Sequence, residues 1–304
     1  MLKIKIGNIE FCSPVIASSG TFGYGDEVKS FVDISKLGGI VTKSITSEPR
    51  LGNSNPRILE SESGMLNAIG LANIGVNEFC DKKIPLINTL NTNIIVSVAG
   101  STIEDYVNVV KEIENTGGNH IGYEINISCP NTKKGGVEFG KDSDMTLKLT
   151  KSIRSLTNKL LIIKLSPNVT SIENIALAAE KGGADAISAI NTIVGMAIDI
   201  NTQKYKLSNK YGGLSGPAIR PIAIANVHKI FNVVSIPVIG IGGVRNSDDV
   251  IEFMLAGASL VQVGTMNYLN PAVGVEISAN LIKHCRNKNI FDISKIIGKV
   301  HNAK

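Results

Sequence analysis

The chain has 304 residues, of which 43% are hydrophobic and 19% charged, and it contains no Trp. These proportions are typical of a globular protein with a large aliphatic core, and the length suits one α/β barrel. The net charge of +5 is not gathered into basic runs interleaved with aromatic residues, so we expect no nucleic-acid binding and only a mild attraction for anionic ligands. No run approaches membrane-spanning length, and residues 1–11 lack the apolar block of a signal peptide. We therefore expect a cytoplasmic protein without membrane association.

The four cysteines lie far apart, and no pair has the C-x-x-C spacing of a zinc or iron–sulfur site. We therefore expect no metal and no cluster on this chain. Free thiols are favoured over disulfide bonds, because no export signal is visible. A lone cysteine is usually a small buried hydrophobic residue, and we interpret Cys12, Cys80 and Cys285 in this way.

Short apolar runs recur along the chain, with helix-length segments between them. Residues 2–6 and 9–11 predict a short β-hairpin that turns at Gly7 and Asn8. Eight further runs predict strands at 15–17, 39–43, 94–98, 123–128, 161–165, 186–191, 237–241 and 260–264.

Helical periodicity fills several of the gaps between these runs. Apolar residues recur every three or four positions over 103–113 and 172–179, and Ser247 is the expected N-cap of a helix over 248–255. The alternation predicts an α/β fold, a single (β/α)8 TIM barrel domain over residues 1–304. A doubly wound sheet is the competing fold, which is less favoured because the chain has no dinucleotide-binding fingerprint.

Two connections, 44–92 and 192–218, are longer than a barrel needs. Long loops in compact domains are usually functional, so we expect both to cover the C-terminal mouth of the barrel.

The stretch from Tyr123 to Asn131, Y-E-I-N-I-S-C-P-N, carries the first candidate for chemistry. Its alternation places Glu124, Asn126 and Ser128 on one face of a strand. Pro130 cannot donate to a sheet ladder, so the strand should end before it and leave Cys129 on a loop at the mouth.

The same alternation, applied to the other strand ends, adds four polar residues in register with Asn126. We expect all five to converge inside the C-terminal mouth, where they would form a pocket for an anionic, hydrogen-bonding ligand. They are Lys43, Ser97, Asn126, Lys164 and Asn191. Each alone is more often a satisfied or solvated loop residue, but five in register are harder to dismiss.

Glycines follow the seventh and eighth strands and let backbone N–H groups approach a phosphate. Gly242 and Gly243 end the seventh strand, and Gly264 and Thr265 end the eighth; Gly216 follows the sixth. Either pair alone could be a simple turn. Together they predict a phosphorylated ligand or cofactor, which barrels frequently hold at this position.

Cys129 has no histidine near it in the predicted fold. His120, His228, His284 and His301 fall in predicted helices or before strands, away from the mouth. A Cys–His hydrolase is therefore disfavoured, and a metal-assisted hydrolase lacks its ligand cluster. A thiol that acts as a general base towards a weakly acidic C–H, beside an electron-accepting cofactor, fits better.

A set of motifs, in order over roughly residues 1–285, resembles the class 1 dihydroorotate dehydrogenases. They are A-S-S-G-T-F-G at 17–23, V-T-K-S at 41–44, N-A-I-G-L-A-N at 67–73, N-I-S-C-P-N at 126–131, K-L-S-P-N-V at 164–169, I-N-T at 190–192, G-G-L-S-G at 212–216, I-G-G-V at 241–244 and V-G-T at 263–265. The form G-M-L-N-A-I-G-L looks most like the class 1B catalytic subunits.

The resemblance implies oxidation of (S)-dihydroorotate to orotate in de novo pyrimidine (UMP) biosynthesis, with FMN at the barrel mouth. Cys129 matches the base that removes the C5 proton while hydride leaves C6 for FMN. Substrate contacts match Lys43, Asn67, Ala68, Ile69, Gly70, Leu71, Asn126, Asn131, Asn191 and Thr192. FMN contacts match Ser19, Lys43, Ser44, Ser97, Asn126, Lys164, Ile190, Gly216, Gly242, Gly243, Gly264 and Thr265. Ser97 departs from the family, because related sequences often have Asn there and a serine reaches less far.

The class 1B resemblance further implies a partner subunit that carries FAD and a [2Fe-2S] cluster and passes electrons to NAD. Two such chains, as a homodimer, would form a heterotetramer with two electron-transfer subunits. Two alternatives remain open: a class 1A homodimer that reduces fumarate, and a non-catalytic barrel that binds a phosphorylated metabolite.

Overall fold

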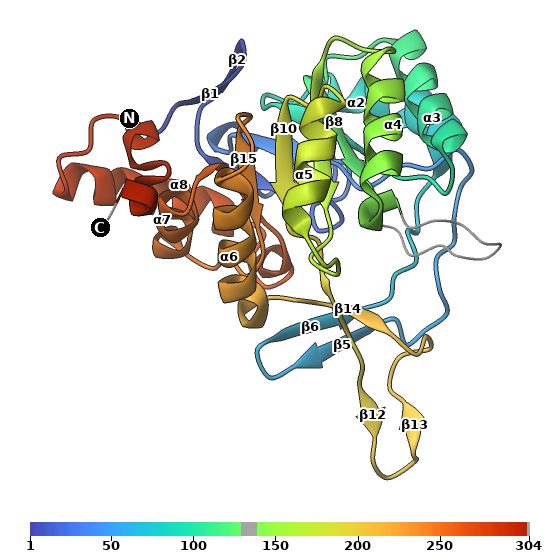
Figure 1. Cartoon of the computed structure of the whole chain (residues 1–304). Coiled ribbons are helices and arrows are strands. Elements are labelled where there is room, and N and C mark those ends of the chain that lie inside the picture. Colours follow the sequence, from blue (N-terminus) through green and yellow to red (C-terminus); the bar gives the residue numbers. More distant parts are fainter. Residues whose placement is uncertain (129–138, 303–304) are drawn as a thin grey trace.

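The computed structural model describes residues 1–128 and 139–302, and eight of its strands form a closed barrel in which every neighbouring pair is parallel (Figure 1). Around the barrel the order is β3 (Val15–Ala17), β4 (Gly39–Val41), β7 (Ile94–Val98), β8 (Gly122–Asn126), β9 (Leu160–Leu165), β10 (Ala186–Ala189), β15 (Val238–Ile241) and β16 (Ala258–Val263), and β16 pairs with β3. The predicted barrel is confirmed and the doubly wound alternative is wrong.

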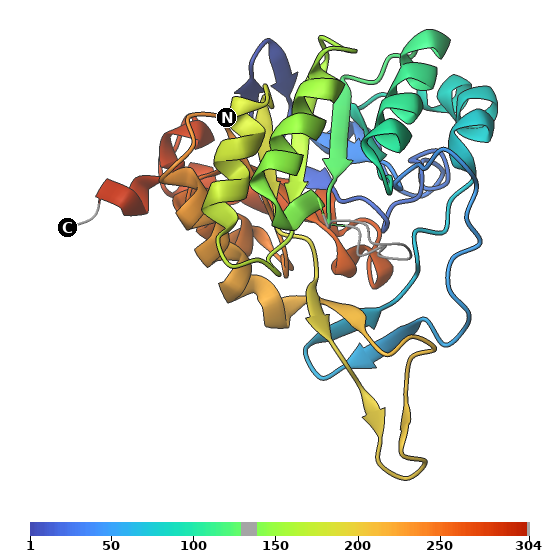
Figure 2. The same ribbon diagram turned by 45° about the vertical axis from the view of Figure 1, so that its right-hand side comes forward.

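Helices surround the strands, as Figures 1 and 2 show. The longer ones are α3 (Ile103–Thr116), α4 (Ser143–Arg154), α5 (Ile172–Lys181), α6 (Arg220–Phe231), α7 (Ser247–Leu255) and α8 (Val273–Asn287). Three short elements, α1 (Gly75–Glu78), η2 (Phe79–Lys83) and α2 (Ile84–Ile87), follow one another without a break. Single turns of 3₁₀ helix are η1 (Ile34–Lys36), η3 (Phe139–Lys141), η4 (Pro217–Ile219), η5 (Thr265–Tyr268), η6 (Ile293–Ile296) and η7 (Lys299–Asn302).

The three helices that periodicity predicted are present, but the expected cap of α7 is wrong. Asn246, not Ser247, is the N-cap: its side-chain oxygen accepts hydrogen bonds from the backbone N–H groups of Asp248 and Asp249. Asn246 has an extended backbone, whereas Ser247 is already the first helical residue. Asparagine and serine are both favourable N-cap residues, so the sequence alone did not show which of the two begins the helix.

The barrel strands read as almost continuous hydrophobic runs because both of their faces are buried. Ile163 and Leu165 of β9 are fully buried, as expected of residues that pack against the surrounding helices. The interior of the barrel also contains polar side chains, among them Glu124 and Gln262, which are equally inaccessible to water.

The N-terminal hairpin pairs β1 (Ile4–Ile6) with β2 (Ile9–Phe11), as predicted. Phe11 is fully buried, and the alternation of the strand then turns Cys12 outward. The expectation that Cys12 is buried is therefore wrong, whereas Cys80 and Cys285 are buried as expected. Figure 2 shows this hairpin at the end of the barrel opposite the long connections.

The two long connections meet beyond the C-terminal ends of the barrel strands (Figure 1). They form an antiparallel sheet in the order β11 (Ile193–Gly195), β14 (Gly212–Ser215), β6 (Gly64–Asn67) and β5 (Ile58–Ser61). A hairpin of β12 (Ile198–Asp199) and β13 (Lys204–Tyr205) projects further outward. The expected cover is confirmed, although 44–92 is not loop throughout, since its second half contains the helical segment α1–η2–α2.

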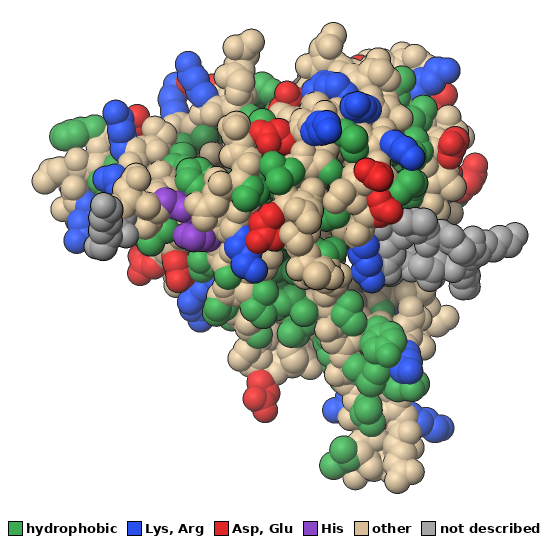
Figure 3. Space-filling model, viewed as in Figure 1, with side chains coloured by type: hydrophobic (Ala, Val, Ile, Leu, Met, Phe, Trp, Pro, Cys, Tyr) green, Lys and Arg blue, Asp and Glu red, His purple; other side chains and the backbone are tan. Residues whose placement is uncertain are grey.

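The projecting hairpin exposes apolar side chains among polar and basic ones, and Figure 3 shows more hydrophobic side chains where it joins the rest of the molecule. Ile198, Ile200 and Tyr205 are each at least half exposed. In the described part of the chain, no helix is both long and apolar enough to cross a membrane.

Candidate active site

A cavity of about 1220 Å³ lies between the C-terminal strand ends and the four-stranded sheet. Most of the predicted site residues line it, although they come from the ends of seven different barrel strands, from the connections that follow these strands or from the covering sheet. The predicted residues in its lining are Ser19, Lys43, Ser44, Asn67, Ala68, Ile69, Gly70, Leu71, Asn126, Lys164, Ile190, Asn191, Thr192, Gly216, Gly242, Gly243, Gly264 and Thr265.

The charge of this lining is of one sign. Its five basic residues are Lys43, Arg50, Arg57, Lys141 and Lys164, and among the described residues no Asp or Glu lines the cavity. Burial, and secondarily the nearby Arg57, lowers the pKa of the Lys43 ammonium. The cavity therefore favours an anionic ligand, whose charge would offset the desolvation of Lys43.

Arg50 and Arg57 were not identified from the sequence. Both lie in the long connection after β4, where no strand alternation marks which side chains point inward. Arg57 donates from Nη1 to the backbone oxygen of Leu51 at 3.2 Å, which holds it at the rim of the cavity. Their position depends on how the connection folds back over the barrel, which no local motif encodes.

Two amide side chains are linked at the ends of β8 and β10. Nδ2 of Asn191 donates to Oδ1 of Asn126 at 3.2 Å, and Oδ1 of Asn191 accepts from the backbone N–H of Thr192 at 2.8 Å. The backbone N–H of Ser128 also donates to Oδ1 of Asn126, at 3.2 Å. With that oxygen occupied, the Nδ2 donors of Asn126 are the groups it can offer to a ligand.

The segment from Asn67 to Leu71 forms another part of the wall. Asn67 donates from Nδ2 to the backbone oxygen of Gly213 at 3.3 Å, which ties it to β14. Asn53, which was not identified from the sequence, donates from Nδ2 to the backbone oxygen of Ala68 at 2.8 Å. These bonds fix a turn in which Gly70 and Leu71 both have positive φ, at 76° and 55°.

Ser97 does not lie in the cavity lining. Its side chain is fully buried and shares a 2.8 Å hydrogen bond with the hydroxyl of Ser44, which does line the cavity. Ser97 thus supports the wall from behind, and its contact with FMN stays a prediction.

The glycine cluster at the cavity wall brings neighbouring chain segments very close together. Gly243 has φ 75°, and a Cβ there would lie 2.7 Å from Cβ of Arg220 and 2.9 Å from the backbone oxygen of Gly216. Gly242 has φ 131°, and its Cβ would lie 2.9 Å from Cβ of Ala223. Only glycine is compatible with this backbone, whose N–H groups suit a phosphate. The cationic lining and this cradle together fit the FMN that the family resemblance implied.

Cys129 and Asn131 lie outside the described residues, as do all residues from 129 to 138. Ser128, the last described residue before them, lines the cavity. No histidine of the described chain lines it, as expected. Over residues 1–128 and 139–302, no cluster of three or more His, Cys, Asp or Glu residues could hold a metal ion.

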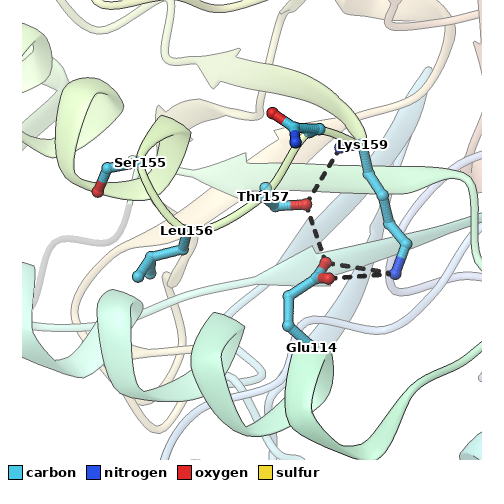
Figure 4. A pocket seen from close by; sticks show the side chains of 6 residues that line it. Glu114, Ser155, Leu156, Thr157 and Lys159 are labelled. Carbon is cyan, nitrogen blue, oxygen red and sulfur yellow. Dashed lines mark hydrogen bonds and ion pairs between the residues drawn. The ribbon is translucent and has the colours of Figure 1, made fainter.

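A second hollow, of about 450 Å³, lies around the start of β9 and the end of α3 (Figure 4). Glu114 accepts hydrogen bonds there from Thr157 at 2.9 Å, from Lys159 at 3.3 Å and from the buried Tyr123 hydroxyl at 2.7 Å. Nε2 of His120 lies 2.9 Å from the same hydroxyl. This hollow contains none of the predicted site residues and is at the N-terminal end of the strands, so it is not the candidate active site.

The fold and the mouth cavity define a class of protein: (β/α)8 barrels with a cationic, glycine-lined cavity at the C-terminal ends of their strands. A family model described as dihydroorotate dehydrogenase matches residues 1–285. The chain belongs to the dihydroorotate dehydrogenase family.

Three similar curated proteins share one name, dihydroorotate dehydrogenase B (NAD(+)), catalytic subunit. The protein from Geobacter metallireducens is 46% identical over 297 residues, which cover 98% of this chain and 97% of that one. The protein from Alkaliphilus metalliredigens is 46% identical over 299 residues, 98% of each chain. The protein from Bacteroides thetaiotaomicron is 46% identical over 297 residues, again 98% of each chain.

Proposed function

We propose that this chain is the catalytic subunit of an NAD-linked dihydroorotate dehydrogenase, which oxidises (S)-dihydroorotate to orotate in de novo pyrimidine biosynthesis. The observation that carries the proposal is the mouth cavity, which combines five cations, paired amide side chains and a glycine cradle without a carboxylate in its described lining. The names of the relatives agree with it. We propose residues 1–304 as one FMN-binding domain.

FMN would occupy the part of the cavity that ends at the glycine cradle. Gly216, Gly242, Gly243, Gly264 and Thr265 would hold its phosphate. Lys164 would favour negative charge on the ring, and Ser19, Ser44 and Ile190 would contribute further contacts. When bound, FMN would supply the acceptor for the hydride that leaves C6 of the substrate.

The substrate would occupy the remaining space, against the amide pair and the Asn67–Leu71 segment. Lys43 would pair with the carboxylate of dihydroorotate, and Asn126 and Asn191 would hydrogen-bond the pyrimidine amides. Cys129 would accept the C5 proton as the general base, with Asn131 and Thr192 holding the ring it acts on.

The electrons would leave through a partner subunit with FAD and a [2Fe-2S] cluster, in a cytoplasmic assembly of two catalytic and two electron-transfer chains. Two observations support a partner. The relatives are named as catalytic subunits, and the hairpin of β12 and β13 exposes Ile198 and Ile200, whose apolar surface is typical of a contact with protein.

The deciding experiment is to record the absorbance spectrum of the purified chain and then to add dihydroorotate without oxygen. We expect a bound flavin whose absorbance near its visible maximum bleaches on addition, with orotate as the product. A colourless protein, or a flavin that stays oxidised, would refute the activity. The second outcome would favour a non-catalytic phosphometabolite-binding barrel.

The electron acceptor needs a separate experiment. The chain purified with the proteins that accompany it should form NADH from dihydroorotate and NAD, and an iron–sulfur flavoprotein should copurify. Steady turnover of fumarate by the isolated chain would instead identify a class 1A homodimer.

A further inference from the structure

Below the floor of the mouth cavity, the barrel encloses a carboxylate that the proposed function leaves without a role. Glu124 of β8 is fully buried, and its side chain contacts three neighbours that come from three other strands. Oε1 lies 3.3 Å from Nζ of Lys164 on β9, and Oε2 accepts from the hydroxyl of Ser188 on β10 at 3.0 Å and from Nε2 of Gln262 on β16 at 2.6 Å.

A carboxylate without water needs partners, because an isolated buried charge is costly. Glu124 has one cation and two neutral donors, so its position is determined by all four strands at once. The pairing of neighbouring strands reinforces this, since Lys164 is in register with Ser188 on one side and with Asn126 on the other.

Lys164 is the member of this network that reaches the cavity. Its side chain is only 8% exposed, yet the residue lines the cavity whose other walls carry four more cations. Within the described residues, Glu124 is the side chain that pairs with Lys164, and it holds the ammonium from beneath.

We propose that Glu124 is a positioning residue that acts through Lys164. Its carboxylate anchors the ammonium at the floor of the cavity and partly compensates the charge that a bound cofactor ring meets there. The effect on the ring rests on the proposed function, because it requires a flavin. The anchoring of Lys164 does not, and it can be measured without any ligand.

The anchoring is tested by the unfolding of the cofactor-free chain in urea, followed by circular dichroism, in a double-mutant cycle of Glu124→Gln and Lys164→Met. Glu124→Gln leaves a buried ammonium without its counter-ion, so its unfolding midpoint should fall well below that of the wild type. The double variant should have a higher midpoint than Glu124→Gln alone. Destabilisations that simply add would overturn the proposal, and Glu112→Gln on the exposed face of α3 is the matched control.

The effect on the cofactor is tested by the midpoint potential of bound FMN, measured against reference dyes at slightly acid pH, where an amine keeps its proton. Glu124→Gln removes a negative charge near the ring and should move the potential to a more positive value. In the Lys164→Met background the ammonium through which Glu124 acts is absent, so the same substitution should produce a smaller shift than in the wild-type background.

An unchanged or lowered potential in Glu124→Gln, or an equal shift in both backgrounds, would overturn the proposal. A purely structural carboxylate would not produce a shift that depends on Lys164. If Glu124→Gln does not retain FMN, Glu124→Asp serves in its place, because it keeps the negative charge on a shorter side chain. Its FMN midpoint potential should lie near that of the wild type. A large positive shift of the potential in Glu124→Asp would count against the proposal. If the wild-type chain binds no flavin, the proposed function fails while the urea cycle still decides the anchoring.

Discussion

At the scale of single residues, the cavity brings together basic side chains that repel one another in the absence of a bound anion. Lys43 is partly buried and close to Arg57, and both effects lower the pKa of its ammonium. The negative charge of a ligand carboxylate or phosphate would offset both effects, so binding and the protonation of Lys43 support each other. The site is therefore selective for anions by its own electrostatics, apart from any shape complementarity.

The residue-scale prediction concerns Cys129. Cys129→Ala should keep FMN, because the proposed FMN contacts lie elsewhere, and should lose roughly 10²–10⁴-fold in the rate of flavin reduction by dihydroorotate at neutral pH. Stopped-flow absorbance measures the rate. In the wild type the rate should rise with pH, since a thiol of ordinary pKa, about 8.5, is only partly ionised at neutral pH.

The matched control is Cys12→Ala, which changes an exposed thiol at the N-terminal hairpin. It should reduce its flavin at the wild-type rate. Wild-type reduction by Cys129→Ala would remove Cys129 from the role of base.

At the scale of elements, the connections after β10 and β15 meet so closely that no side chain fits between them. Gly243 follows β15, and its missing Cβ leaves room for the backbone oxygen of Gly216, which precedes η4. The approach depends on two segments that are distant in sequence. A larger residue at Gly243 would therefore shift the backbone of both segments, and not only one side-chain contact.

The element-scale prediction is that Gly243→Ala folds but binds FMN about tenfold or more weakly, because the new methyl group must displace the backbone of the cradle. Fluorescence titration of the cofactor-free chain with FMN measures the affinity. Gly117→Ala is the control: its φ of 71° is similar, but nothing lies within 4 Å of its Cβ. It should cost about 1 kcal/mol of stability and leave FMN affinity unchanged. Equal FMN affinity in both variants would contradict the cradle.

At the scale of the whole molecule, the two ends of the barrel differ in charge and in side-chain contacts. The C-terminal end is cationic and lined for a ligand, whereas the N-terminal end contains the hydrogen-bonded cluster around Glu114 (Figure 4). His120 belongs to that cluster, and burial, with a contribution from Lys159, lowers the pKa of its imidazole to about 4. Hydrogen bonds from Tyr123 and Thr157 help to lower the pKa of the Glu114 carboxyl.

These shifts predict that the chain loses stability in mild acid. The imidazole of His120 binds a proton near pH 6.5 in the unfolded chain, but only near pH 4 in the folded one. Between these values the unfolded state holds more protons, so stability is full above pH 6.5 and falls as the pH drops towards 4, by roughly 2–3 kcal/mol from this group.

Urea unfolding at a series of pH values, followed by circular dichroism, measures this loss. His120→Asn should be less stable at neutral pH but should lose less on acidification than the wild type. His284→Asn on α8 serves as the control and should follow the wild-type profile. An identical acid loss in His120→Asn and the wild type would exclude His120 as the source.

Much of the architecture could be predicted, because burial imposes a period on the sequence. The eight barrel strands were found as apolar runs, and the polar residues at their ends predicted Lys43, Asn126, Lys164 and Asn191 as members of the site. The same reasoning failed where no period exists, as for Arg57 in the connection after β4. It also placed Ser97 in the pocket, although its hydroxyl bonds to Ser44 behind the wall.

Local pattern and motif therefore determined the barrel, its mouth and most of the residues around the cavity, since strand alternation and glycine turns are properties of short segments. Only the tertiary structure determined which charged side chains lie close to one another. The five cations share one cavity because the barrel gathers its strand ends and the connection after β4 adds Arg50 and Arg57. Glu124 faces Lys164, Ser188 and Gln262 because the barrel closes. Electrostatic interactions depend on distance in space, and the closure of the barrel brings together residues that lie far apart along the chain.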